Sequence, residues 1–216
     1  MKSIGGSTFI KVTQLFSDGE GDQLLFKLNN GAISLIAADN VVEYPSLSPQ
    51  IERFKGYDGT MTDEEHAAVA RQAIASVDVF KTGNGPDNGN LACLWAARHV
   101  VYFATQQWIT YKDGTATFYG ELEAGGMKPE TADSLPPGAI IISPTTQKAV
   151  GHIGLLGSGS GGSRPVFSNH SPSPQDLVAR WRQNYTVESF TQAHAKKGLQ
   201  TLFYRLPRPA DSAAIS

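Results

Sequence analysis

The single cysteine is the residue of this chain whose chemistry is most specific. Cys93 follows Gly89-Asn90, which is typical of a helix start, and we predict that Cys93 lies in the first turn of a helix over about residues 91–108. Unpaired backbone N–H groups and the positive end of the helix dipole stabilise a thiolate there, and they can bind an oxyanion. Cys93 is therefore predicted to be a nucleophile, with a buried and inert cysteine as the alternative.

A thiol nucleophile needs a base, and His152 fits that role best among the five histidines. It lies between two glycines in Gly151-His152-Ile153-Gly154, at the start of an apolar strand. Small neighbours leave room for a substrate or a facing helix. His99 follows Cys93 by six residues and faces away from it on a helix, whereas His66 and His194 lie in polar stretches and are predicted to be exposed.

A third polar residue usually orients the imidazole in such a site. Asn169 ends the predicted strand that follows the one carrying His152, and a hairpin would bring its side chain beside the ring. His170 would face the opposite side of that strand. We favour Asn169 as the orienting residue and keep His170 as the second candidate.

The elements that must position these residues follow from periodicity and from helix and turn signals. Thr62 and Glu65 form a capping-box pattern at the start of a predicted helix, and further helices are predicted over residues 114–124 and 177–185. Strands are predicted over residues 139–143, 150–156, 165–169 and 199–206, after an N-terminal β-meander whose strands cover about residues 8–15, 24–28 and 32–36. Strands, then helices, then strands indicate an α+β fold.

Four short motifs, in this order, resemble those of the NlpC-type papain-like cell-wall peptidases and their relatives, the CHAP amidases. The first resembles the nucleophile helix, the second the strand before the base, the third the strand of the base itself, and the fourth the strand that supplies the third polar residue. They are Asn90-Leu91-Ala92-Cys93-Leu94-Trp95-Ala96, Pro137-Gly138-Ala139-Ile140-Ile141-Ile142-Ser143-Pro144, Gly151-His152-Ile153-Gly154-Leu155 and Phe167-Ser168-Asn169.

The resemblance implies a papain-like core over residues 60–207, in which the nucleophile helix packs on an antiparallel sheet. Residues 1–48 would be a small β-meander extension or an accessory module, and residues 208–216 a disordered tail. The implied catalytic residues are Cys93, His152 and Asn169. The implied substrate-binding residues are Asn90, Trp95 and His170, and the family needs neither metal nor cofactor.

The function implied by the resemblance is cleavage of amide bonds in peptidoglycan stem peptides, by an amidase or endopeptidase such as a phage lysin or antibacterial effector. A cysteine protease or deamidase that acts on proteins, or a catalytically inactive binding module, is the alternative. Expected partners are therefore peptidoglycan or a peptide substrate, together with an immunity or inhibitor protein.

Composition excludes several other classes of function. The net charge of −2 argues against nucleic-acid binding, and no run approaches the roughly 18 apolar residues of a membrane span. One cysteine permits neither an intramolecular disulfide nor a thiolate metal cluster. Because no apolar stretch follows Met1-Lys2, we expect no signal peptide, and a cytoplasmic protein until release or non-standard export to the cell wall.

Overall fold

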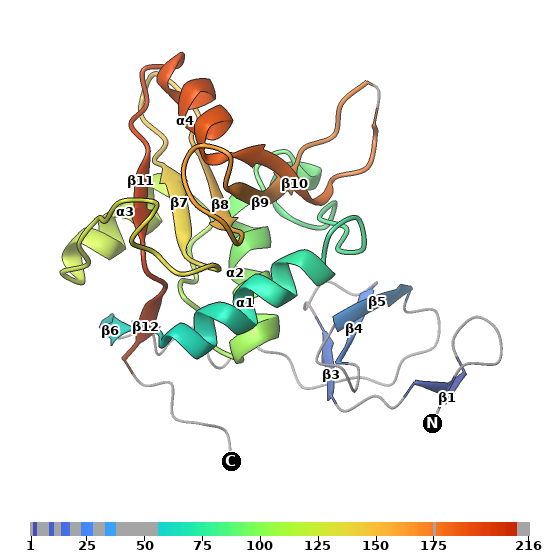
Figure 1. Cartoon of the computed structure of the whole chain (residues 1–216). Coiled ribbons are helices and arrows are strands. Elements are labelled where there is room, and N and C mark those ends of the chain that lie inside the picture. The colour runs from blue at the N-terminus through green and yellow to red at the C-terminus, as the bar shows by residue number, and fades with distance from the viewer. Residues whose placement is uncertain are drawn as a thin grey trace. The chain divides into compact units, whose positions relative to one another are not determined.

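A computed structural model describes residues 56–174 and 176–210, together with the backbone of five short strands nearer the N-terminus (Figure 1). The chain divides into two units, Met1–Arg53 and Phe54–Ser216. The candidate site residues all belong to the second unit.

The N-terminal unit contains a three-stranded antiparallel sheet in the order β3-β4-β5. Its strands are β3 (Gln14–Ser17), β4 (Gln23–Lys27) and β5 (Ile33–Ala37), and β1 (Lys2–Ser3) pairs with β2 (Phe9–Ile10). The spatial order follows the chain order, as in the predicted meander.

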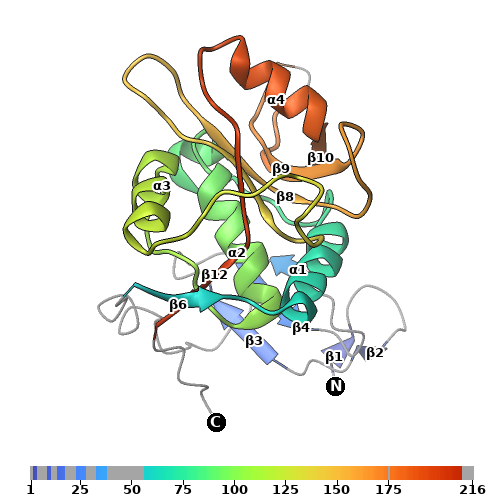
Figure 2. The same cartoon turned by 60° about the vertical axis from the view of Figure 1, so that its left-hand side comes forward.

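The second unit is built on a five-stranded sheet in the order β10-β9-β8-β7-β11, with every neighbouring pair antiparallel (Figure 2). Two residues in register across neighbouring strands share a face, and residues alternate between faces along each strand. The register therefore decides which candidate residues can meet. The strands are β7 (Ile140–Ser143), β8 (His152–Leu156), β9 (Pro165–His170), β10 (Arg180–Thr186) and β11 (Leu202–Tyr204).

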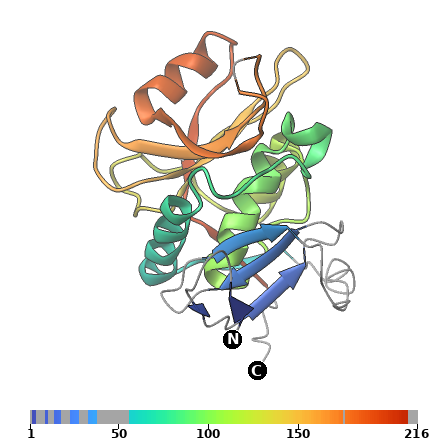
Figure 3. The ribbon, with the colours of Figure 1, turned by 90° about the vertical axis from the view of Figure 1, so that its right-hand side faces the viewer.

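Helices cover both faces of this sheet (Figures 1 and 3). Helix α4 (Val187–Ala195) packs through Phe190 on one face, in a core that includes Ile141, Leu156 and Val166. Helices α1 (Asp63–Ala75) and α2 (Cys93–Thr105) pack on the other face, where the fully buried Trp181 donates a hydrogen bond from Nε1 to the Ala73 carbonyl. Helix α3 (Thr115–Ala124) follows α2 in the chain. The predicted α+β fold is confirmed.

Helix α1 begins where its sequence predicts. Thr62 is the N-cap: its hydroxyl accepts a hydrogen bond from the Glu65 N–H at 3.2 Å, and Glu65 accepts one from the Thr62 N–H at 2.7 Å. His66, predicted to be exposed, is fully buried, because its Nε2 accepts a hydrogen bond from the N–H of Leu206, 140 residues away. Its Nδ1 therefore carries the proton and donates to the Thr62 carbonyl.

The C-terminal third departs most from the predicted elements. The helix predicted over residues 177–185 is wrong, because pairing with β9 makes most of that segment the strand β10, and α4 follows it. Pro207–Pro209 forms β12, paired with β6 (Tyr57–Thr60), so the predicted disordered tail begins as a strand. Residues 211–216 lie outside the described part of the chain.

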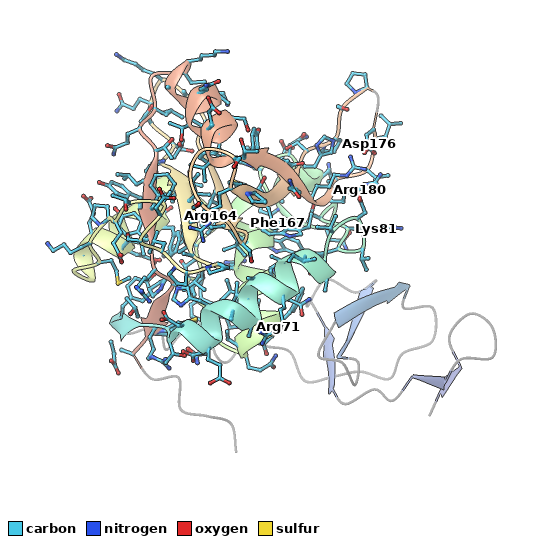
Figure 4. The ribbon with its side chains drawn as sticks, viewed as in Figure 1. Arg71, Lys81, Arg164, Phe167, Asp176 and Arg180 are labelled. Carbon is cyan, nitrogen blue, oxygen red and sulfur yellow. The ribbon has the colours of Figure 1, made fainter. Side chains whose placement is uncertain are left out.

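The long loop between β8 and β9 is anchored by one buried cation. Arg164 is 2% exposed, and its guanidinium donates hydrogen bonds to the carbonyls of Gly157, Leu135 and Ala132 (Figure 4). Buried charge is tolerated where such hydrogen bonds replace water. Arg164 thus fixes the end of β8 against the turn that precedes β7.

The helices of the described residues are short. The longest, α1 and α2, have 13 residues each, and within residues 56–174 and 176–210 no helix combines the length and apolar character that a membrane crossing needs.

Candidate active site

Cys93 is the first residue of α2 and thus lies in its first turn, as predicted. The N-cap, Ala92, has no side chain that could cap the helix, so backbone N–H groups at this end are left for other partners. The backbone N–H groups of Leu94, Ile153 and Cys93 itself approach the thiol and act to lower its pKa. The start of α2 and the start of β8 therefore meet at the sulfur atom.

The thiol lies in an environment that favours its neutral form, whereas the sequence predicted one that stabilises the thiolate. Burial raises the pKa of Cys93 above its usual value, although the N–H groups of Leu94, Ile153 and Cys93 itself act in the opposite direction. The prediction included the effect of the helix terminus on the thiol pKa but not the effect of burial against the sheet. In the resting structure Cys93 is therefore a neutral thiol at pH 7, rather than the predicted thiolate.

His152 is the first residue of β8 and belongs to the face covered by α4. Its ring centroid lies 5.8 Å from that of Tyr185 and 5.9 Å from those of Phe190 and His194, the last nearly parallel to it at 7°. Among the described residues, its buried Nε2 has no hydrogen-bond partner. Burial, together with the nearby His194 and Lys197, lowers the pKa of His152 to about 3, so the imidazole is neutral at pH 7.

The thiol and the imidazole lie on opposite sides of β8. Cys93 contacts the backbone N–H of Ile153, whereas the His152 ring points toward α4. Their backbones are nevertheless close, because the nitrogen of residue 153 is about 2.4 Å from the Cα of His152.

Asn169 does not lie beside His152, and this corrects the expected triad. In the pairing of β8 with β9, Gly154 is opposite Ser168, so residue 169 is out of phase with residue 152 and faces α2. The Asn169 side chain is 3% exposed, donates from Nδ2 to the Gly89 carbonyl at 2.7 Å, and accepts a hydrogen bond from the Thr82 hydroxyl. Its contacts are with the loop before α2.

His170 shares the α4-side face with His152 by alternation, but it lies in an ionic network. Its Nε2 is 3.9 Å from a carboxylate oxygen of Asp176, which also pairs with Arg180 at 2.7 Å and Arg182 at 2.8 Å (Figure 4). Burial of the Asp176 carboxyl opposes, and these arginines favour, its ionised form; its pKa is lowered overall. His170, the last residue of β9, thus lies beside Asp176 of the loop before β10.

Asn90 and Trp95, the other two predicted binding residues, flank Cys93. Asn90 is exposed, and its carbonyl accepts a hydrogen bond from the Ser171 hydroxyl at 3.1 Å. Trp95 is half-buried and stacks on Phe80 at 5.6 Å and against His99 at 4.1 Å. Asn90 is thus available to a substrate, whereas the Trp95 ring is largely engaged within the protein.

Two features of the site escaped sequence reasoning. Thr82 is fully buried and hydrogen-bonds Asn169 across 87 residues, which no local pattern indicates. His194 was predicted to be exposed but is buried against His152. Here a signal existed, because Val187, Phe190 and His194 recur at the spacing of one helix face.

Among the described residues, no group of three or more histidine, cysteine, aspartate or glutamate side chains forms a metal-binding cluster. Comparison with protein-family models, with curated proteins and with solved structures gives no match to this chain. The assignment of function therefore depends on the geometry of Cys93 and His152 and on the sequence motifs around them.

Proposed function

We propose that this protein is a cysteine-dependent hydrolase of amide bonds, with Cys93 as nucleophile and His152 as base. The observation that carries the proposal is the approach of the Ile153 N–H to the Cys93 thiol, whose pKa that N–H lowers. It joins the start of the nucleophile helix to the start of the strand that carries the base, so both functional groups project from one small region of the backbone.

Catalysis requires the His152 imidazole to leave the α4 side and reach the sulfur. This takes a movement of the backbone at the start of β8 as well as a change of rotamer, because the Cβ of a strand residue stays on one face of the sheet. The neutral His152 imidazole can then accept the thiol proton, since only an unprotonated ring can act as a base. An imidazolium beside the sulfur also favours the thiolate and offsets the effect of burial on its pKa.

The thiolate would attack the amide carbonyl, forming a C–S bond while the carbonyl π electrons move to oxygen. The N–H groups of Cys93 and Leu94 at the start of α2 would bind this oxyanion. Collapse breaks the C–N bond, and the amine leaves with the proton held by His152. Water, deprotonated by the same imidazole, then hydrolyses the thioester to a carboxylate and restores the thiol.

The resemblance of the four motifs to NlpC-type peptidases supports a papain-like core and peptidoglycan stem peptides as substrate. A helix that begins at the nucleophile and packs on an antiparallel sheet is consistent with that assignment. Such an enzyme would act after release or export to the cell wall, and an immunity or inhibitor protein that covers Cys93 would keep it inactive before then.

A second candidate function, a catalytically inactive binding module, is favoured by the resting geometry itself. The thiol is buried with a raised pKa, and the histidine ring faces away from it. This alternative makes Cys93 a packing residue, so the two functions differ in what modification of the thiol does.

Selective alkylation tests the proposal, because Cys93 is the only thiol of the chain. The protein should label slowly at pH 7 and faster as pH rises toward the thiol pKa, since only the thiolate reacts. Labelling to one group per chain at pH 9, followed by reagent removal, should abolish release of free amines from purified peptidoglycan. Protein incubated at pH 9 without reagent is the control.

Full hydrolysis by protein that carries one label per chain would refute the nucleophile. Parallel incubation with casein separates a protein-directed protease from a cell-wall enzyme. Absence of hydrolysis of either substrate by unlabelled protein would favour the binding module.

A further inference from the structure

The loop that precedes α2 is held to β9 by a buried polar network. Thr82 and Asn169 are 0% and 3% exposed; the Thr82 hydroxyl donates to Oδ1 of Asn169, and Nδ2 of Asn169 donates to the Gly89 carbonyl at 2.7 Å. The Thr82 carbonyl accepts from the Gly85 N–H at 3.0 Å, and its N–H donates to the Ala179 carbonyl at 2.9 Å. Buried hydrogen bonds of this kind specify one arrangement of the chain.

The loop also packs closely against its neighbours at Gly89. Gly89 has φ of +90°, and a Cβ there would lie 2.2 Å from the Cβ of Ala179 and 3.0 Å from the Thr82 carbonyl oxygen. Asp87 and Asn88 also have left-handed φ angles, 54° and 52°, which asparagine and aspartate adopt more readily than most residues. Only three residues separate Gly89 from Cys93, so a shift at Gly89 moves the start of α2.

We propose that Thr82 and Asn169 are positioning residues, which act on the nucleophile rather than on the imidazole. By fixing the Gly89 carbonyl they hold the first turn of α2, which lacks a side-chain N-cap, so that the Cys93 sulfur lies against the Ile153 N–H. This role goes beyond the proposed function. Only its expected effect on catalysis rests on that function. Its structural consequence, the placement of the thiol, can be measured without any substrate.

The test compares Thr82→Val, which loses the hydroxyl at nearly constant shape, with Thr82→Ser, which keeps it. Asn169→Asp is a second variant, because a carboxylate cannot donate to the Gly89 carbonyl. For Thr82→Val and Asn169→Asp we expect kcat to fall by about 10- to 100-fold at a nearly unchanged KM, as for supporting residues elsewhere. Iodoacetamide should label Cys93 about tenfold faster at pH 7.5, because the thiol leaves its buried site and its pKa falls.

Thr82→Ser should match the original protein in both measurements, and circular dichroism should show that each variant remains folded at the assay temperature. The positioning role would be overturned if folded Thr82→Val and Asn169→Asp labelled at the same rate as the original protein, with the same midpoint in the pH dependence of labelling. If the original protein hydrolyses nothing while the variants label faster, the proposed function fails and the positioning of Cys93 stands.

The original protein alone also provides a test should the variants not fold. The Asn169 side-chain amide protons should exchange slowly with solvent in its NMR spectrum, because one of them is hydrogen-bonded in a buried position. Exchange at the rate of an exposed amide would exclude the network and the proposal with it.

Discussion

His152→Ala should lower kcat by about 10²- to 10⁴-fold, the range over which a general base contributes to catalysis. The other candidates do not replace it, because Asn169 cannot act as a base, His99 is buried within α2 and His170 lies beside Asp176. Steady-state hydrolysis of the substrate identified by amine release measures the effect. Thermal unfolding of the variant establishes that the loss is not loss of fold.

His194→Phe is the matched control for His152→Ala. It removes the other histidine of the stacked pair, whose centroid lies 5.9 Å from that of His152, but keeps an aromatic ring in its place. We expect it to retain kcat within a few fold, because His194 contacts the base only in the resting position. Equal losses in the two variants would mean that the aromatic cluster, rather than a base, supports activity.

Acid should destabilise the protein steeply below about pH 6. Four of the five histidines, His66, His99, His152 and His194, have pKa values lowered chiefly by burial, to about 3 for His99 and His152. An unfolded histidine titrates near 6.5, so below that pH the unfolded chain binds protons that the folded chain does not. The free energy of unfolding therefore falls as pH falls.

Each histidine that is protonated only when unfolded contributes roughly 1 kcal/mol of destabilisation per pH unit. For His99 and His152 the window extends from about pH 6 down to about pH 3, and the lowered pKa values of His66 and His194 act in the same direction. Urea unfolding between pH 7 and pH 4 measures the slope. His99→Phe should reduce the slope by the contribution of one histidine, and equal stability at pH 7 and pH 5 would show that the buried rings are accessible to protons.

Local signals in the sequence were sufficient for the elements that begin with a cap or a turn. Thr62 and Glu65 located α1, and the motif that begins with Pro137-Gly138 located β7. Cys93 does lie in the first turn of α2, as predicted, although the helix begins at Cys93 after Ala92 rather than at about residue 91 after a cap at Gly89 or Asn90. The helix predicted at 177–185 failed because an edge strand gains its hydrogen bonds from a neighbour, which periodicity within one segment does not contain.

The sequence was sufficient to predict which elements carry Cys93 and His152, but not which side chains contact one another. Cys93 and His152 do lie at the starts of a helix and a strand that meet, but strand phase decides which side chains share a face. A shift of one residue exchanges the two faces, so the pairing of Gly154 with Ser168 was enough to send Asn169 to Thr82 and Gly89 instead of His152. Long-range contacts such as Thr82 with Asn169 depend on the assembled sheet.

The most direct test of Cys93 as the nucleophile is mass spectrometry of purified peptidoglycan fragments after incubation with the protein or with Cys93→Ala. We predict fragments with new amine and carboxylate termini, formed by addition of water across an amide bond, from the protein that has Cys93. The Cys93→Ala variant, folded by circular dichroism, should yield none above the level without protein. The same fragments at the same rate from folded Cys93→Ala would contradict the assignment.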